Sequence, residues 1–207
     1  MRKMLSVLAL AGVLTTASTA SALPIAATNL DTWIVNAGDL VAGPTVDTFK
    51  TSTLATIGTL TNLVFLNEQL SYYTYVHLVQ PTINNISEVN TGFEVAGFTG
   101  HAGWSFTMAG LAGGSGTAAD FVVDYEDGGL DWETQFFQNG SKGFDAGEAI
   151  AFFFVSTKPP TTGSYNMINS KAGTAESFAP VPEPGSLALL ASGMLGLLVR
   201  RRRRVQN

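Results

Sequence analysis

The chain has 207 residues, 11 of them basic and 16 acidic, and its formal net charge is −5. The charges are segregated, because residues 23–179 hold fifteen acidic side chains against four lysines and no arginine. Binding to nucleic acid depends on Lys and Arg at the phosphates, so this acidic region argues against a nucleic-acid partner. The sequence has no cysteine, which excludes disulfides, cysteine-ligated zinc and thiol catalysis.

The first part of the chain, residues 1–22, is predicted to be a secretory signal peptide. A basic start (Arg2-Lys3) precedes an apolar run, and Ala20 and Ala22 frame a small-x-small cleavage site. The apolar run of about 11 residues is too short for a membrane span, which takes about 20. We therefore expect signal peptidase to cut after Ala22 and the rest of the chain to be exported.

The last part of the chain, residues 180–207, has three segments in a fixed order: a Val-Pro-Glu-Pro motif, an uncharged apolar stretch over residues 185–199, and an arginine cluster. A 15-residue helix rises about 22 Å, which is short of the roughly 30 Å hydrocarbon core, and arginine snorkelling covers part of the gap. We expect a transmembrane helix in the inner membrane, with the arginines retaining it from the cytoplasmic side. These are Arg200, Arg201, Arg202, Arg203 and Arg204.

This order resembles the PEP-CTERM sorting signal of Gram-negative bacteria, and Pro182, Glu183 and Pro184 match its motif residue by residue. The resemblance implies recognition by exosortase, a membrane protease-transpeptidase, followed by removal of the tail and transfer to the cell envelope or the exopolysaccharide matrix. The two prolines keep the chain extended, which suits a protease substrate. The alternative is an ordinary C-terminal membrane anchor with a proline-rich neck.

The region between the two ends, residues 23–179, is predicted to form one all-β domain, a single antiparallel and jelly-roll-like β-sandwich. Its length suffices for one domain that buries about 70% of its unfolded surface. Short apolar runs separated by turn residues, without an amphipathic helix, favour this fold. An early Gly-Thr-Leu-Thr hairpin and a later Gly-Glu segment before a Phe-rich strand also resemble other PEP-CTERM proteins, which implies a sandwich of unassigned function.

Alternation of side chains predicts two hairpins. The first spans residues 59–79 with its turn at Asn67-Glu68, and Pro81 ends its second strand because proline cannot donate to a ladder. The second spans residues 120–138 around the turn Asp127-Gly128-Gly129. The remaining predicted strands are a fully buried one at 149–155, further ones at 45–51, 91–98, 103–108 and 164–168, and a last edge strand at 172–180.

No catalytic motif is complete in the sequence. The two histidines are interpreted as a sheet residue, His77, and a loop residue, His101, although serines and acids are numerous enough to leave a Ser-His-Asp triad open. Residues 113–117 fail the Gly-x-Ser-x-Gly elbow at the fifth position, and the glycines at 114–119 lead into a β-run instead of a helix. We expect a protein that is not an enzyme.

The second hairpin carries six acidic side chains within 14 residues. Clustered carboxylates repel one another unless solvent separates them or a cation binds, and Ca²⁺ prefers oxygen ligands from loops. We therefore consider a calcium site, with a solvated hairpin tip as the alternative; a glycosidase pair of carboxylates is the less favoured reading. The candidate calcium ligands are Asp124, Glu126, Asp127 and Asp131.

Aromatic side chains offer a further possibility, a platform on which sugar rings stack. The alternative is that these rings belong to the core, as large aromatics usually do. The candidates are Tyr73, Tyr75, Trp33, Trp104 and Trp132. The sequence thus predicts an exported structural or adhesive surface protein without a bound cofactor. A calcium-dependent carbohydrate-binding module and an exported polysaccharide hydrolase are the alternatives.

Overall fold

The computed structural model describes residues 23–107, 121–134 and 144–180, so the predicted signal peptide and the predicted helix at 185–199 lie outside the described residues. A short helix, α1 (Leu30–Trp33), and a 3-10 turn, η1 (Ile34–Asn36), accompany the strands. The strands are β1 (Leu23–Ile25), β2 (Thr28–Asn29), β3 (Asp39–Thr51), β4 (Thr56–Asn67), β5 (Tyr72–Pro81), β6 (Glu88–Thr91), β7 (Phe98–Ser105), β8 (Phe121–Glu126), β9 (Gly129–Thr134), β10 (Ile150–Ser156), β11 (Thr161–Ile168) and β12 (Ala172–Ala179).

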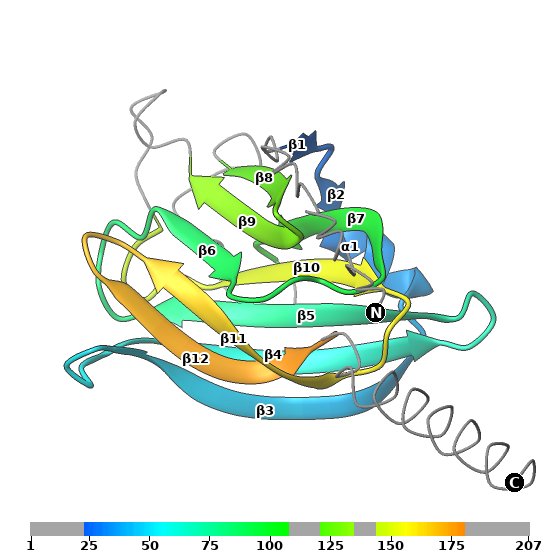
Figure 1. The fold of residues 1–207 in the computed structure, drawn as a ribbon, viewed down its shortest axis with the longest axis horizontal. Helices are drawn as coiled ribbons and strands as arrows, with labels where there is room; N and C mark the ends of the chain where they lie inside the picture. The colour runs from blue at the N-terminus through cyan, green and yellow to red at the C-terminus, as the bar shows by residue number, and fades with distance from the viewer. Residues whose placement is uncertain (1–22, 108–120, 135–143, 181–207) are drawn as a thin grey trace, which may run out of the picture.

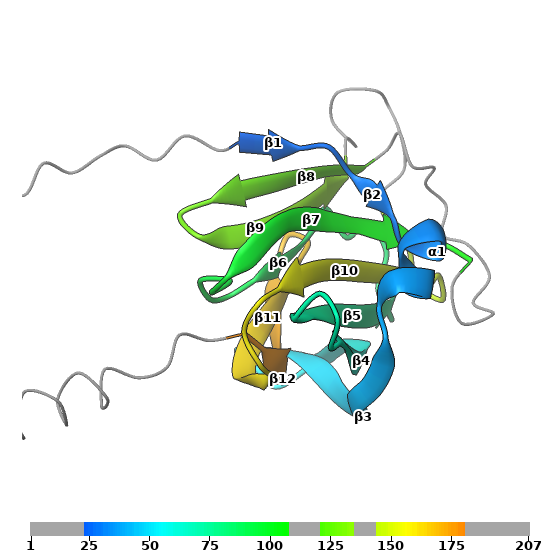
Figure 2. The same cartoon turned by 90° about the vertical axis from the view of Figure 1, so that its right-hand side faces the viewer.

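Hydrogen bonds join these strands into one 12-stranded sheet in the order β1-β8-β9-β6-β11-β12-β3-β4-β5-β10-β7-β2. The sheet curls on itself, and Figures 1 and 2 show its two halves facing each other. The strands at its two ends, β1 and β2, are neighbours in the chain, so the curl brings the ends together. The all-β prediction is confirmed, and the two facing halves belong to one continuous sheet. Among the described strands, β2 and β7 form the one parallel pair.

Both predicted hairpins are present. In the first, β4 and β5 pair with Leu60 opposite Val79, and β5 ends at Pro81 as predicted. In the second, the two-residue turn between β8 and β9 has positive φ at Asp127 (49°) and Gly128 (84°). Such a turn matches the twist of the flanking strands, which explains why a Gly follows the Asp.

The Phe-rich strand β10 is buried along its whole length, between β5 and β7, as predicted. Because successive side chains of a strand point to opposite faces, Phe152 and Phe154 enter the main core inside the curl. Phe153 and Val155 enter a second apolar cluster on the other face, where Leu30 of α1 covers them. The sequence reading missed α1, whose first turn is capped by the Asn29 side chain.

Three local predictions were wrong. The last strand, β12, was predicted at an edge of the sheet, but it pairs with β11 on one side and β3 on the other. The predicted strand at 91–98 is mostly a loop, because its backbone N–H groups bond to three different places: Gly92 to Ser164 O, Val95 to Gly128 O and Ala96 to Pro180 O. His101, predicted to lie in a loop, lies within β7. All three errors concern segments with hydrogen-bond partners that are distant in the sequence.

Candidate functional site

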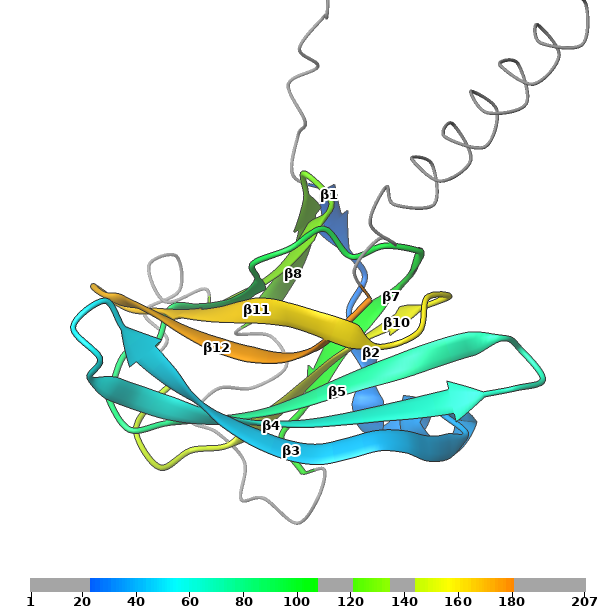
Figure 3. The ribbon, with the colours of Figure 1, turned by 60° about the horizontal axis from the view of Figure 1, so that its bottom comes forward.

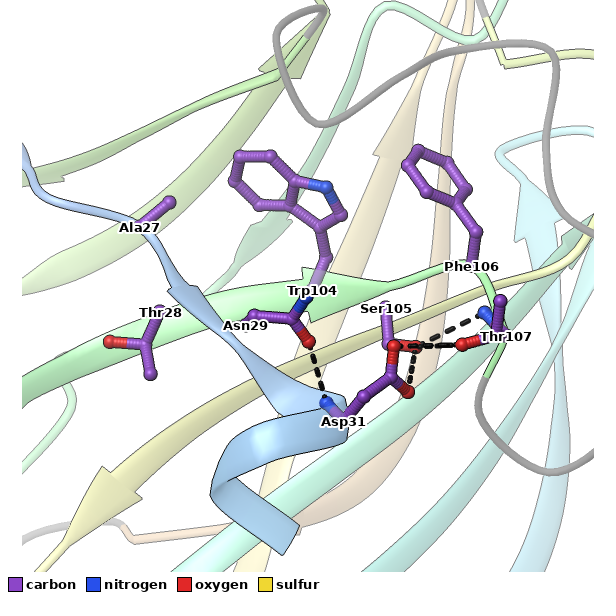
Figure 4. A pocket seen from close by; sticks show the side chains of 8 residues that line it. All are labelled: Ala27, Thr28, Asn29, Asp31, Trp104, Ser105, Phe106 and Thr107. Atoms are coloured by element: carbon purple, nitrogen blue, oxygen red, sulfur yellow. Dashed lines mark hydrogen bonds between the residues drawn. The ribbon is translucent and has the colours of Figure 1, made fainter.

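A pocket of about 310 Å³ opens where β2 and α1 meet the end of β7 (Figure 4). The parallel pairing of β2 with β7 places the start of α1 beside the last residues of β7. The Asn29 side chain accepts a hydrogen bond from the Asp31 N–H (2.8 Å) and fixes the first turn of α1. The lining residues are Ala27, Thr28, Asn29, Asp31, Trp104, Ser105, Phe106 and Thr107.

The Asp31 carboxylate is the polar centre of this pocket. One of its oxygens accepts a hydrogen bond from Ser105 Oγ (2.6 Å) and the other from Thr107 Oγ1 (2.7 Å). Hydrogen bonds to a charged acceptor are stronger than neutral ones, so the two hydroxyls hold the carboxylate in one orientation. Each oxygen keeps further acceptor capacity toward a ligand hydroxyl.

The described lining residues of the pocket include neither a Ser-His-Asp triad nor a pair of carboxylates. No histidine is among its described lining residues, and Ser105 donates its proton directly to a carboxylate. A Ser-His-Asp triad needs an imidazole between these groups. Asp31 is also the only acid among the described lining residues, whereas glycosidases use two carboxylates. The arrangement is suited to binding a polar group.

Sequence reasoning missed Asp31, Ser105 and Thr107. The Asn29 cap followed by an acid two residues later is a signal for a helix start that would have located α1. Nothing in the sequence pairs Asp31 with the two hydroxyls, because they lie 74 and 76 residues further along the chain.

The candidate aromatic platform is divided between the core and the surface. Trp132 is buried and donates from Nε1 to Gly103 O (3.1 Å), and Tyr75 is buried against Phe154. Trp104 is only 6% exposed, at the wall of the pocket, and Tyr73 packs against the main core. Trp33 is the tryptophan that reaches the surface.

Trp33, at the edge of the second apolar cluster, is the centre of a small aromatic cluster. The Trp33 ring lies 4.6 Å from the ring of His101 and 5.8 Å from that of Tyr72. Its Nε1 donates to Thr74 Oγ1 (3.2 Å), which fixes the indole. His101 is therefore an exposed residue beside an indole ring.

His77 is an interior sheet residue, as predicted, and is 2% exposed. Its Nδ1 donates to Asn62 Oδ1, and its ring lies between those of Phe154 (5.3 Å) and Tyr165 (4.3 Å). Burial lowers the pKa of His77 to about 3 because the apolar surroundings disfavour the charged form. Within the described residues, His77 Nε2 and Asn62 Nδ2 have no hydrogen-bond partner.

The acidic side chains of β8 and β9 lie on the face of the hairpin opposite to its buried residues. Asp124 and Asp131 are directly opposite across β8 and β9, and Glu88 of β6 is opposite Glu133. Burial, together with the negative charges of neighbouring acids, raises the pKa of Asp131 from 3.8 to about 6; these acids are Glu88, Glu133, Glu126 and Asp124. Asp127, the remaining candidate calcium ligand, lies in the turn itself.

No group of three or more His, Asp or Glu side chains in the described part of the chain is arranged to hold a metal ion. A strand face separates carboxylates along the sheet, whereas a calcium site gathers six or more oxygens around one point. Calcium binding by these four residues stays a prediction.

The last part of the chain matches a known protein family. Residues 180–204 match the family described as PEP-CTERM protein-sorting motif. The chain carries a PEP-CTERM sorting motif. Such a motif makes exosortase the processing partner and marks an exported protein of Gram-negative bacteria with a membrane-anchored precursor. Comparison with curated proteins and with solved structures finds no match.

The matched segment begins at Pro180, the residue that directly follows β12. The PEP-CTERM residues Pro182, Glu183 and Pro184 lie inside the match and outside the described residues. None of the helices within 23–107, 121–134 and 144–180 is long and apolar enough to span a membrane.

Proposed function

We propose that the β domain is a structural or adhesive module, without enzymatic activity, which processing at Pro182-Glu183-Pro184 delivers to the cell envelope or the extracellular matrix. The observation that carries the proposal is the PEP-CTERM motif placed directly after β12, which makes the domain the cargo of the sorting signal. Until processing, residues 185–199 hold the precursor in the inner membrane.

Processing breaks one peptide bond near the motif. The carbonyl carbon at the new end of the domain bonds to a water oxygen or to an acceptor amine, and the tail leaves with the freed amino group.

The test follows the full chain, with an internal tag, in a host that has exosortase. We expect Glu183→Ala to remain membrane-bound with its tail attached. Glu176→Ala is the matched control, because Glu176 is an exposed acid seven residues earlier, on β12. Normal release of the Glu183 variant would contradict processing at this motif, and a block of both variants would indicate a folding defect.

A second candidate function is carbohydrate binding at the Asp31 pocket. Its volume of about 310 Å³ lies at the lower end of the range for small-ligand sites. An oriented carboxylate beside an indole wall suits a sugar, whose hydroxyls donate and whose ring face is apolar. We expect binding to immobilised matrix polysaccharide to be lost in Asp31→Asn and kept in Asp39→Asn, an exposed acid at the start of β3.

Repeating the binding measurement with excess EDTA tests the calcium-dependent form of this function. Loss of binding in EDTA would support a calcium role for Asp124, Glu126, Asp127 and Asp131. Equal binding of Asp31→Asn and the unsubstituted protein would remove the pocket as the sugar site.

A further inference from the structure

The end of the β domain is fixed by hydrogen bonds. Three successive backbone carbonyls, the last ones in the described residues, each accept a hydrogen bond from a different residue. The bonds run from Tyr165 Oη to Phe178 O (2.7 Å), from Thr161 Oγ1 to Ala179 O (2.8 Å) and from Ala96 N to Pro180 O (3.1 Å). Two of the donors belong to β11 and the third to the loop before β7.

Packing adds to these bonds. β12 pairs with β11 along all of its length, ending with Thr161 opposite Ala179 (Figure 3). Ala179 is fully buried and Pro180 is also buried. The backbone of Gly163 lies so close that a Cβ placed on it would be 2.5 Å from the Ala179 Cβ. The chain is therefore fixed to the domain up to Pro180.

The sorting motif begins almost at once after this point. Val181 alone separates Pro180 from Pro182. Two residues span at most about 7 Å, so Pro182 cannot move further than that from the folded surface while Pro180 is docked. Proteins that bind an extended peptide pair with its backbone over several residues. The carbonyls preceding the motif are already engaged within the domain.

We propose that the docked end of β12 restricts access to the sorting motif, and that exosortase processing requires local release of Phe178–Pro180 from the domain. This inference rests on the proposed processing at the motif. Tyr165, Thr161 and Ala96 act as positioning residues that set how often the motif is presented. The fold thereby limits the rate at which the protein leaves the membrane.

The size of the effect follows from the three bonds. A neutral hydrogen bond of average net strength changes an equilibrium about fivefold. Because all three bonds must break before the motif is released, they lower the fraction of molecules with a released motif about a hundredfold. A spacer of six Gly and Ser residues between Pro180 and Val181 adds roughly 20 Å of reach and makes release unnecessary. Processing of this insertion variant should be up to about a hundredfold faster, measured by pulse-chase of the full chain in an exosortase host.

Two matched controls accompany the insertion. The same spacer between Glu68 and Gln69, in the exposed turn after β4, should leave the processing rate unchanged. Tyr165→Phe, which frees Phe178 O, should process about fivefold faster. Tyr75→Phe loses an equivalent phenol bond, to Lys158 O (2.8 Å), and should process at the original rate.

The outcomes separate the two proposals. If no variant is processed, including the unsubstituted chain, the proposed function fails. If the unsubstituted chain is processed and the spacer after Pro180 gives the same rate, the inference about β12 is overturned. Adding Tyr165→Phe to the spacer variant should give no further acceleration, and a further gain would indicate general destabilisation of the domain instead of release of its end.

Discussion

The buried pair of Asn62 and His77 predicts how the stability of the domain depends on pH. The pKa of His77 is about 3 in the folded protein and about 6.5 in the unfolded chain. Between these values the unfolded chain binds one proton more than the folded protein. The contribution of His77 to stability is therefore fully present above pH 6.5 and is lost as the pH falls.

The size of this loss can be calculated from the shift. Each pH unit below 6.5 removes about 1.4 kcal/mol, so at pH 4.5 the free energy of unfolding should be lower by about 2–3 kcal/mol. Replacing both partners by leucine, Asn62→Leu with His77→Leu, removes the titrating group and both unpaired atoms. Since each unpaired buried polar atom costs about 1–3 kcal/mol, we expect the double variant to be at least as stable at pH 7.

The assay is urea unfolding of residues 23–180, followed by tryptophan fluorescence at several pH values from 7 to 4. A matched control is His101→Leu, which removes the histidine of β7 at the surface and should keep the acid-induced loss. If the double variant and the unsubstituted domain lose the same free energy between pH 6.5 and 4.5, the buried histidine is not the cause and the reasoning is refuted.

Three further predictions concern the same domain. Folding raises the pKa of Asp131 from 3.8 to about 6, so its contribution to stability is present below pH 3.8 and is lost as the pH rises through 6, opposite to that of His77. In the same urea series, Asp131→Asn should therefore steepen the acid-induced loss of stability. It should also raise the free energy of unfolding at pH 7 by up to about 1 kcal/mol, allowing for solvent screening. Gly128→Ala should destabilise the domain by more than the roughly 1–2 kcal/mol that a positive φ costs, because a Cβ there would lie 2.4 Å from Glu94 Cγ. Gly100→Ala, with nothing within 4 Å of its Cβ, should cost only the roughly 1–2 kcal/mol of the positive φ. Equal melting temperatures of the two variants would contradict this. Phe154→Ala should cost about 3–5 kcal/mol, and a loss below 1 kcal/mol would show that β10 is not central to the core.

Features that depend on neighbouring residues were readable from the sequence. The sorting motif is a contiguous segment, and its order of motif, apolar stretch and arginines was recognised at the residues that the family comparison matches. The hairpin at Asp127-Gly128 follows from turn chemistry, which needs positive φ at two adjacent positions. The burial of β10 follows from an uninterrupted apolar run, which has no polar face to turn toward water.

The curl of the sheet and the Asp31 pocket depend on contacts between distant segments. Side-chain alternation states which residues share a face of a strand, and it does not state which strand lies alongside. The loop at 92–97 satisfies its N–H groups on Ser164, Gly128 and Pro180, and Asp31 meets Ser105 across 74 residues. The pairing of distant strands also decides that Trp132 lies in the core and that Trp33 is only partly buried. Local propensity acts over a few residues, whereas burial of one shared core selects the register among segments far apart in the chain.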